Sequence, residues 1–393
     1  MKKNVAFMTP DLKSGGSERV ASRLTKLLSQ RYNVFYIVFS DDGKSYDVDG
    51  TLINMNVPST PNKLKRYFNI IRKRTKLRKI CKENKIDILF AFTHNANTTM
   101  RVSGLKCKCV GSCRGFSDLR DNTADYHATI ASGADMLFNA KEMENFYLSK
   151  YPEDKDKLYT IENLFDCNKI ADMAKEELDE NEKKFYSEHT VVSNCGTLND
   201  QKGQWDLIKS FEILKESVPN AGLVIVGHRG NYEQEIHDMA KRSRYADDIM
   251  FVGYTANPFK YMYNSRVYAL SSVNEGFPNA LIEAMVCQTP VVATDCETGP
   301  LEILCDDLSC KRPSDEYLLA DNGILTPCFD KQADFGLDNK NDNHRIFAAA
   351  IEKLITDTGL AKKYSENGIK RAYKDDESNI SKQYFDFIES RFK

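Results

Sequence analysis

Hydrophobic residues in the first half of the chain occur in short continuous runs separated by amphipathic stretches. The runs at residues 3–9, 33–40, 86–93 and 108–113 are apolar at almost every position, as in "IDILFAFT". Continuous apolar runs are typical of strands in a parallel sheet that helices cover on both faces. The stretch 17–30 between the first two runs predicts one such helix.

A second series of the same kind follows. Its predicted strands are 190–198, 221–227, 248–254, 266–272 and 289–295. Helices are predicted at 203–216 and 231–243, and the chain from about Asn343 onward reads as helical throughout. The segment "MAKEELDENEKKFYSEH" between the two series is rich in charge and has no apolar face, which predicts a linker. We therefore expect an α/β protein with two Rossmann-like domains in tandem and a cleft between them.

Composition fits an ordinary soluble protein. The 393 residues are 41% hydrophobic and 28% charged, and no long uncharged apolar run predicts a transmembrane helix. The opening "MKKNVAFMTPDLKSGG" has an apolar stretch that Pro10 and Asp11 interrupt at once, which predicts a strand rather than a signal peptide.

The eleven cysteines are scattered, and Cys107, Cys109 and Cys113 form their one cluster. Zinc binding there would need a fourth ligand and a better spacing, so we predict no metal site. Reduced, partly buried thiols indicate a reducing cytosol.

Net charge is divided unequally along the chain. The total is -2, but residues 1–165 carry +10 and the remainder carries -12. An asymmetry of this size suggests two units with different partners.

The stretch "NEGFPNALIEAM" places a loop after the strand 266–272 and starts a helix near Asn279. Ligands of open α/β sheets bind beyond the carboxyl ends of strands. The first amides of this helix, at Ala280 and Leu281, would suit a phosphate group.

Two glutamates flank this helix start. Glu283 would repel a phosphate if it pointed at it, so it is better placed to accept hydrogen bonds from the hydroxyls of a ribose. Glu275 on the loop could then hold sugar hydroxyls beyond the phosphates. The alternative is that Glu283 is a favourable acid in a first helical turn and that Glu275 faces solvent.

Two further loops repeat this arrangement. In "NCGTLNDQKGQWDLI", Gly196 ends a strand and Lys202 opens the next helix, where a lysine beside helix amides can bind a diphosphate. A solvated loop lysine is the alternative. In "TPDLKSGGSERV", Gly15 and Gly16 precede a helix and would let the backbone approach a ligand closely, although a Gly-Gly loop alone is a weak signal.

Together these motifs resemble the GT-B glycosyltransferases, specifically the large retaining family 4. The segments that carry the resemblance are "GGSERVASRL", "TIENLFD", "GTLNDQKGQWDLI", "VGYTANPFKYM", "SSVNEGFPNALIEAM" and "PVVATDCETGPLEIL". The last of these is similar to a bacterial subgroup that builds lipid-linked glycans. The resemblance implies an acceptor-binding domain at 1–167, a nucleotide-sugar-binding domain at 168–375 and a helix at 376–393 that packs on the first domain.

The resemblance also implies roles for individual residues. Glu283 would bind the ribose, Glu275 the donor sugar and Lys202 the diphosphate. The residues that it implies for the donor site are Gly15, Gly16, Thr197, Lys202, Arg229, Val252, Glu275, Gly276, Phe277, Asn279, Ala280, Leu281, Glu283, Thr298 and Gly299. Those that it implies for catalysis are Glu275, Lys202, Arg114 and His94.

Two positions depart from the family pattern. The family usually has an arginine where this chain has Thr197, and many members have a histidine where this chain has Arg114. Arg114 and Arg229 are candidates to restore the missing positive charge. His94 ends a strand and is a candidate contact for the acceptor, or a histidine satisfied by its local surroundings.

By this resemblance we expect a retaining, metal-independent transfer of a hexose or N-acetylhexosamine from a UDP-sugar, without a cofactor. The acceptor would be a polyprenyl-diphosphate-linked glycan used in a capsule, an O-antigen or a similar surface polymer. An inactive GT-B partner or chaperone of another transferase is the alternative that Thr197 raises. A nicotinamide-dependent dehydrogenase would need a G-x-G-x-x-G fingerprint, which does not follow the first strand.

The stretch "NKLKRYFNIIRKRTKLRKI" is basic between Lys63 and Lys79 and carries Leu64, Tyr67, Phe68, Ile71 and Leu77 at roughly helical spacing. Such a helix can lie on an anionic leaflet, which predicts a cytoplasmic protein peripheral to the inner face of the membrane. The alternative is an ordinary helix with its apolar stripe on the sheet and a solvated basic face. Nucleic acid is a poorer partner, because aromatics for base stacking are not interleaved with the patch and the second half is acidic.

Overall fold

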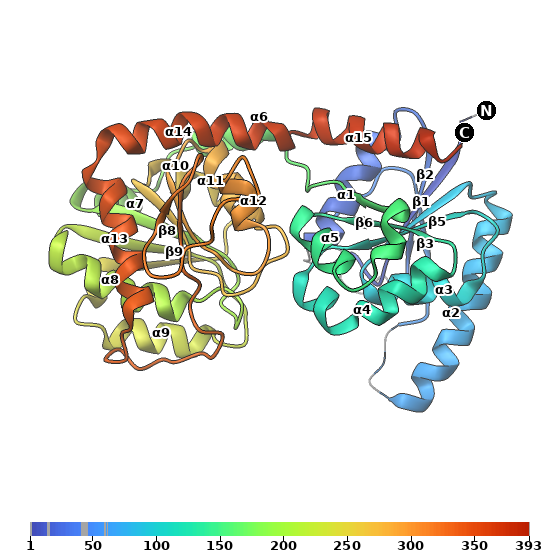
Figure 1. The fold of residues 1–393 in the computed structure, drawn as a ribbon, viewed down its shortest axis with the longest axis horizontal. Helices are drawn as coiled ribbons and strands as arrows, with labels where there is room; N and C mark the ends of the chain where they lie inside the picture. The colour runs from blue at the N-terminus through green and yellow to red at the C-terminus, as the bar shows by residue number, and fades with distance from the viewer. Residues whose placement is uncertain (1, 14–15, 41–45, 59, 61, 393) are drawn as a thin grey trace. The chain divides into compact units, whose positions relative to one another are not determined.

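A computed structural model describes residues 2–13, 16–40, 46–58, 60 and 62–392 of the chain, with the backbone alone at 63, 64 and 66. The chain forms two units (Figure 1), and each is described by itself below. Unit 1 consists of residues 1–164 and 377–393, and unit 2 consists of residues 165–376. Both are α/β units built on a mainly parallel sheet, which confirms the predicted fold class.

The described residues of unit 1 form a parallel sheet of seven strands in the order β3-β2-β1-β4-β5-β6-β7. Its strands are β1 (Asn4–Thr9), β2 (Asn33–Val38), β3 (Thr51–Asn54), β4 (Ile88–Phe92), β5 (Lys108–Cys113), β6 (Asp135–Phe138) and β7 (Leu158–Thr160). Its helices are α1 (Gly16–Leu28), α2 (Lys63–Glu83), α3 (His94–Ser103), α4 (Phe116–Ala131), α5 (Lys141–Leu148), η1 (Pro152–Lys157) and α15 (Glu377–Ser390).

Strand β1 shows why its run of apolar residues is continuous. Val5 and Phe7 pack into a core with residues of α1 and α15, whereas Ala6 and Met8 pack into a second core with residues of α2 and α3. Because helices cover both faces of the sheet, neither face of the strand can be polar.

The last helix of the described chain, α15, belongs to unit 1. Ile380, Tyr384 and Ile388 are fully buried in the same core as β1 and β4, and the Tyr384 ring lies 6.3 Å from the ring of Phe90. The core of unit 1 is therefore completed by a segment that follows all of unit 2 in the sequence.

Unit 2 has a second seven-stranded sheet in the described residues, in the order β10-β9-β8-β11-β12-β14-β13, with β13 antiparallel at its edge. Its strands are β8 (Thr190–Cys195), β9 (Ala221–Val226), β10 (Ile249–Gly253), β11 (Val267–Leu270), β12 (Val291–Thr294), β13 (Leu318–Leu319) and β14 (Ile324–Thr326). Its helices are α6 (Cys167–Ala174), α7 (Glu180–Glu188), α8 (Gln204–Ser217), α9 (Glu233–Arg242), η2 (Ala246–Asp248), α10 (Phe259–Asn264), α11 (Asn279–Val286), α12 (Pro300–Leu304), α13 (Asp342–Thr356), α14 (Thr358–Ala372) and η3 (Tyr373–Asp375).

Both sheets contain a switch point, where consecutive strands begin to be added on the opposite side. In unit 1 it lies between β1 and β4, and in unit 2 it lies between β8 and β11. The loops after the two strands at a switch point leave the sheet in opposite directions, and ligands of open α/β sheets bind in the crevice between them. Topology therefore directs attention to the loops that follow β8 and β11.

The predicted linker is wrong, because helix α7 forms within it. Asp179 and Glu182 form a reciprocal capping box at its start, with the side chain of each accepting from the backbone of the other. Lys260 also donates to the Glu182 carboxylate, at 2.9 Å. Capping and ion pairs stabilise this helix, and its half-buried Phe185 and Tyr186 pack against a core that includes Val191 and Val224.

Removing the side chain of Ile388 should destabilise unit 1. We expect Ile388→Ala to lower its free energy of unfolding by about 2–5 kcal/mol, because the variant leaves a cavity in a close-packed core. Gln383→Ala, on the exposed side of the same helix, is the matched control and should change little.

Urea unfolding followed by circular dichroism measures this effect. The single tryptophan, Trp205, lies in unit 2 and provides an internal reference by fluorescence. An Ile388→Ala protein that unfolds at the wild-type urea concentration would contradict the placement of α15 in the core of unit 1.

Candidate functional site

An ion pair joins the two loops at the switch point of unit 2. Lys202 lies at the end of the loop after β8, Glu275 lies on the loop after β11, and the Lys202 Nζ is 2.5 Å from the Glu275 Oε1. The Glu275 side chain is only 10% exposed and that of Lys202 is 25% exposed. The sequence motifs predicted both side chains for one site, and the structure brings them together. Burial of this pair argues against the alternative in which each faces solvent.

Hydroxyl groups hold the same two loops. Ser272 donates to the Glu275 carboxylate at 2.8 Å, and Thr298 donates to the Glu275 backbone carbonyl at 2.7 Å. Ser271 donates to the Lys202 carbonyl at 2.8 Å. These bonds hold the Glu275 carboxylate and the backbone of both loops in position.

Two glycines allow the loops to approach this closely. Gly203 has φ of +60°, and a Cβ at this position would collide with the carbonyl oxygen of Ser271. Gly299 has φ of +95°, and a Cβ there would lie 2.5 Å from the Pro278 side chain. Both positions need a conformation and a closeness that side chains oppose.

Glu283 lies on α11 and is only 5% exposed. Its charge contributes to raising the pKa of the buried Tyr268 hydroxyl, for which desolvation is the largest cause and the nearby Cys195 the next. A surface acid that merely favours the start of a helix would be solvated. The burial of Glu283 therefore disagrees with the alternative of a solvated acid at the start of a helix.

The start of α11 lies beside the Glu275 loop. Asn279 and Ala280 are half-buried there, whereas the Leu281 amide donates to the carbonyl of Pro278 at 3.0 Å and is engaged in the first turn. Gly276 and Phe277 are buried in the loop that leads to this turn. The predicted anion-binding end of the helix therefore follows the glutamate directly.

The remaining candidates of unit 2 lie on three other loops. Thr197 is exposed, and its carbonyl accepts from the Gln204 side chain at 3.3 Å. Arg229 is exposed, with a φ of +53°, and its backbone amide donates to the Glu233 carboxylate at 3.0 Å. Val252 is half-buried in β10.

Unit 1 has its own cluster at its switch point. His94 begins α3 directly after β4, and its Nε2 lies 3.0 Å from the Asp125 carboxylate, which also accepts from Arg101 at 3.1 Å. These partners lower the pKa of Asp125, with His94 the largest cause. Thr93, just before, has a φ of +95°, which is strained for a threonine. The Asp125 carboxylate is the local partner that the second interpretation of His94 expects.

Arg114 follows β5 at the same edge of the sheet. Its guanidinium donates to the side chains of Asn163 and Ser112 and lies 5.3 Å from the centre of the Phe92 ring. The group is held in place by these contacts. Gly16 is exposed at the start of α1, and Gly15 lies outside the described residues.

Sequence reasoning missed the groups that support the ion pair. Ser271 and Ser272 donate hydrogen bonds to the two loops, and the buried Tyr268 hydroxyl donates to the Cys195 carbonyl at 3.3 Å, at the end of β8. Two serines directly after a predicted strand were a usable signal, because hydroxyls at that edge can reach the next loop. Among the residues that the structure describes, no group of three or more His, Cys, Asp or Glu side chains could hold a metal ion.

Helix α2 divides the apolar stripe that the sequence predicted. Leu77 is fully buried, and Lys73 is 8% exposed with its ammonium 3.6 Å from the centre of the Phe39 ring, so this half packs on the sheet. Tyr67 and Phe68 are 64% and 63% exposed, and in Figure 1 their half of α2 extends beyond the rest of unit 1. We call eight of the exposed residues of this helix the α2 surface: Lys65, Tyr67, Phe68, Ile71, Arg72, Arg74, Lys76 and Lys79.

No helix in the described part of the chain is long and apolar enough to span a bilayer.

Two family models match the chain, one in each half. The model described as Glycosyltransferase Family 4 matches residues 14–169, and the model described as Glycosyl transferases group 1 matches residues 175–324. The boundary between the matches falls close to the boundary between the two units.

Similar proteins extend over almost the whole chain. An uncharacterized glycosyltransferase of Methanocaldococcus jannaschii is 28% identical, covering 93% of this chain and 94% of its own. The N-acetylgalactosamine-N,N'-diacetylbacillosaminyl-diphospho-undecaprenol 4-alpha-N-acetylgalactosaminyltransferase of Campylobacter jejuni is 25% identical, covering 96% and 97%.

Solved structures share the fold. A glycosyltransferase of Rickettsia africae superposes with a TM-score of 0.77 at 17% identity, covering 100% of this chain and 99% of its own. HepE of Anabaena, crystallised with UDP, has a TM-score of 0.73 at 18% identity, covering 99% and 100%. Together with the two sheets, these similarities confirm the GT-B fold.

Gly203→Ala should disrupt the junction of the two loops. We expect a loss of about 2 kcal/mol or more in the free energy of unfolding of unit 2, because the substitution combines a left-handed backbone with a clash. Gly196→Ala is the matched control in the same loop, since its nearest contact would be Lys202 Cδ at an ordinary 3.5 Å.

Urea unfolding followed by Trp205 fluorescence measures both variants. Equal stability of the Gly203→Ala and Gly196→Ala proteins would contradict the close approach of the two loops.

Proposed function

Because this chain is a glycosyltransferase of the GT-B fold, similar to family 4 in its first half and to group 1 in its second, we propose that it is a retaining enzyme for lipid-linked glycans. It moves a hexose or an N-acetylhexosamine from a UDP-sugar to a glycan on a polyprenyl diphosphate. The observation that carries the proposal is the buried Lys202–Glu275 pair at a switch point, with the buried Glu283 on the helix that follows.

The donor fits these groups by charge. A diphosphate brings negative charge that competes with Glu275 for the ammonium of Lys202, which lies 2.5 Å from the Glu275 carboxylate. When Lys202 turns to the diphosphate, the Glu275 carboxylate becomes available to accept hydrogen bonds from sugar hydroxyls. Glu283 accepts from the ribose. One ion pair thus couples recognition of the diphosphate to recognition of the sugar.

Catalysis follows from the same electrostatics. Breaking the bond from the anomeric carbon to oxygen leaves positive charge on the sugar and negative charge on the diphosphate. Lys202 and the amides near Asn279 and Ala280 stabilise the leaving diphosphate, and fixed donors of this kind make the largest contribution to lowering such a barrier. The acceptor hydroxyl attacks on the face that the diphosphate leaves, and the diphosphate takes its proton. This route uses neither a metal nor a carboxylate nucleophile.

The acceptor is proposed from the relatives. The Campylobacter jejuni enzyme is named for a diphospho-undecaprenol acceptor, and shorter matches include glycosyltransferases of capsular polysaccharide and of O-antigen biosynthesis. In unit 1, His94 and Arg114 lie at the carboxyl edge of the sheet and are the groups we propose for contact with the acceptor and its phosphates.

The α2 surface provides the membrane contact in this proposal. Its aromatic and basic side chains are exposed together, which matches a helix that inserts apolar groups among anionic headgroups. Each cation near such a leaflet contributes about 1 kcal/mol. A lipid-linked substrate and a peripheral enzyme on the cytoplasmic face then meet at one surface.

One observation supports a second function, that of an inactive GT-B partner of another transferase. Thr197 is exposed where the family usually has an arginine. The positive charge that would neutralise the leaving diphosphate is therefore missing at that position. An inactive GT-B partner of another transferase would tolerate this loss. The retained, buried Lys202–Glu275 pair favours the active enzyme, because an unused buried ion pair is costly to keep.

Glu283→Gln should weaken the binding of UDP roughly tenfold or more, because hydrogen bonds to a charged group contribute about 1.5–3 kcal/mol. Isothermal titration calorimetry with UDP measures the affinity. Glu366→Gln, an exposed carboxylate in unit 2, is the control that should bind UDP normally. UDP binding that is unchanged in Glu283→Gln would contradict the ribose assignment.

The same proteins decide between the two functions. With a panel of UDP-sugars and a polyprenyl-diphosphate-linked acceptor, the wild type should release UDP with at least one donor. Tight UDP binding without release across the panel would favour the inactive partner.

Changing the α2 surface should release the protein from anionic vesicles. Lys65→Glu, Arg72→Glu and Arg74→Glu together should lower partition into phosphatidylglycerol vesicles roughly tenfold or more. Tyr67→Ser with Phe68→Ser should also lower it, whereas Tyr263→Ser, an exposed tyrosine of unit 2, should not. Co-sedimentation measures the partition, and undiminished binding of the charge-reversed protein would remove the membrane proposal.

A further inference from the structure

Unit 1 contains a cavity of about 790 Å³ that takes no part in the proposed transfer. It lies at the amino ends of β4 and β5, the sheet edge opposite His94 and Arg114, beside the last turns of α2. The lining residues are Arg78, Cys81, Lys82, Ile86, Asp87, Gly104, Leu105, Lys106, Cys107, Lys108 and Phe392. All of them belong to unit 1, so the cavity is formed within a single unit.

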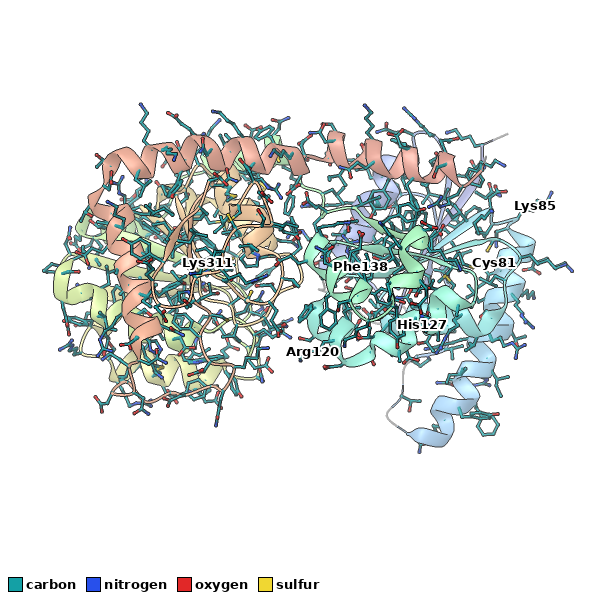
Figure 2. All side chains as sticks on the ribbon, viewed as in Figure 1. Cys81, Lys85, Arg120, His127, Phe138 and Lys311 are labelled. Atoms are coloured by element: carbon teal, nitrogen blue, oxygen red, sulfur yellow. The ribbon has the colours of Figure 1, made fainter. Side chains whose placement is uncertain are left out.

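Two thiols line this cavity, and a third follows shortly after them in the sequence of β5. Cys81 comes from α2 (its position is labelled in Figure 2), and Cys107 and Cys109 come from the start of β5. Cys107 and Cys109 pack against the core cluster that contains Cys81, and the Cys109 thiol donates to the carbonyl oxygen of Cys107 at 3.6 Å. The neighbouring thiols, Cys109 before Cys81, lower the pKa of Cys107, and the proximity of Cys107 raises the pKa of Cys81. Cys107 is half-buried and lines the cavity, so a reagent that enters can reach it.

The walls of the cavity are basic. Arg78, Lys82, Lys106 and Lys108 line it, against a single acid, Asp87. The Asp87 carboxylate already accepts the backbone amide of Asn4 at 2.8 Å. The cavity therefore favours an anionic guest, and Ile86, Leu105 and Phe392 give it an apolar floor.

The arrangement points to thiol–disulfide chemistry. The three cysteines are not part of a metal-binding group within the described residues. A thiolate next to cations is the nucleophile of disulfide exchange, and a neighbouring thiol can resolve the product. Cys81 lines the cavity as Cys107 does, whereas Cys109 is not among the lining residues.

We propose that Cys107 is a modification site, which forms a mixed disulfide with a small carboxylate-bearing disulfide bound in the basic cavity, and that Cys81 resolves it. In the first step the Cys107 thiolate attacks one sulfur of RS–SR. The bond from Cys107 to that sulfur forms, the S–S bond of the reagent breaks, and the electron pair leaves on RS⁻.

In the second step the Cys81 sulfur attacks the Cys107 sulfur. The Cys81–Cys107 bond forms, the second RS⁻ leaves and takes the proton of the Cys81 thiol, and the protein is oxidised by two electrons. The reagent is reduced to two thiols, which balances the exchange. This inference is independent of the transferase proposal.

Two probes of opposite charge test the cavity. The reduced full-length protein is incubated with glutathione disulfide, which carries carboxylates, and in parallel with cystamine, which is cationic. Intact mass and peptide mapping follow the products. We expect glutathione to appear first on Cys107, and cystamine to react there roughly tenfold more slowly or less, because the basic walls attract one probe and repel the other.

Variants separate the steps. Cys81→Ser should accumulate the glutathione adduct on Cys107, since no thiol resolves it, and the wild type should proceed to a Cys81–Cys107 disulfide. Lys106→Gln with Lys108→Gln should slow glutathione disulfide and leave cystamine as fast or faster. Cys310→Ser, which removes a half-buried cysteine of unit 2, is the control that should change nothing.

The proposal is overturned by either of two results. One is first modification at another half-buried cysteine, such as Cys195, Cys310 or Cys328. The other is equal rates for the two probes at Cys107. Both are measured on the wild-type protein, so they hold even if a cysteine variant fails to fold.

Discussion

The contact between the loops after β8 and β11 is the constraint on which the candidate site depends. Parallel strands deliver both loops to one edge of the sheet, but topology alone leaves their separation open. The Lys202–Glu275 pair and the serine hydroxyls set that separation, and Gly203 permits it. A buried ion pair is seldom the most stabilising choice for such a position. In the proposed function, the negative charge of the donor diphosphate replaces Glu275 as the partner of Lys202.

Burial separates the two readings that the sequence left open for the glutamates. Glu275 and Glu283 are spaced as surface acids on a loop and a helix often are, and composition does not reveal which side they face. The structure buries both within a unit whose sheet has ordinary apolar cores. Free energy spent on burying charge, at an edge where ligands bind in related folds, makes a binding role the simpler account.

Much of the fold was predictable from sequence, because strands that are covered on both faces have apolar residues at almost every position. The helix α7 was missed because its apolar contacts come from two adjacent aromatic residues, Phe185 and Tyr186, which form no helical stripe, and the rest of its stability comes from its capping box and its ion pair with Lys260. In the site, Lys202 and Glu275 were predictable from their motifs, whereas the hydrogen bond from Ser271 to the Lys202 carbonyl joins residues that only the folded chain brings near. Helix α2 shows the same limit: its spacing predicted a stripe, but not that Leu77 is buried while Tyr67 is exposed.

The position of α15 has a consequence for biosynthesis. Unit 1 begins to leave the ribosome first, yet the helix that covers Phe7 and Phe90 is translated only after the whole of unit 2. At ordinary elongation rates this delay is on the order of ten to forty seconds. During that interval α1 can cover only part of this apolar sheet face, and the part that α15 covers later is a natural substrate for chaperones that bind emerging polypeptides. Premature termination within unit 2 would leave that face permanently open, so shortened products should be insoluble rather than partly active.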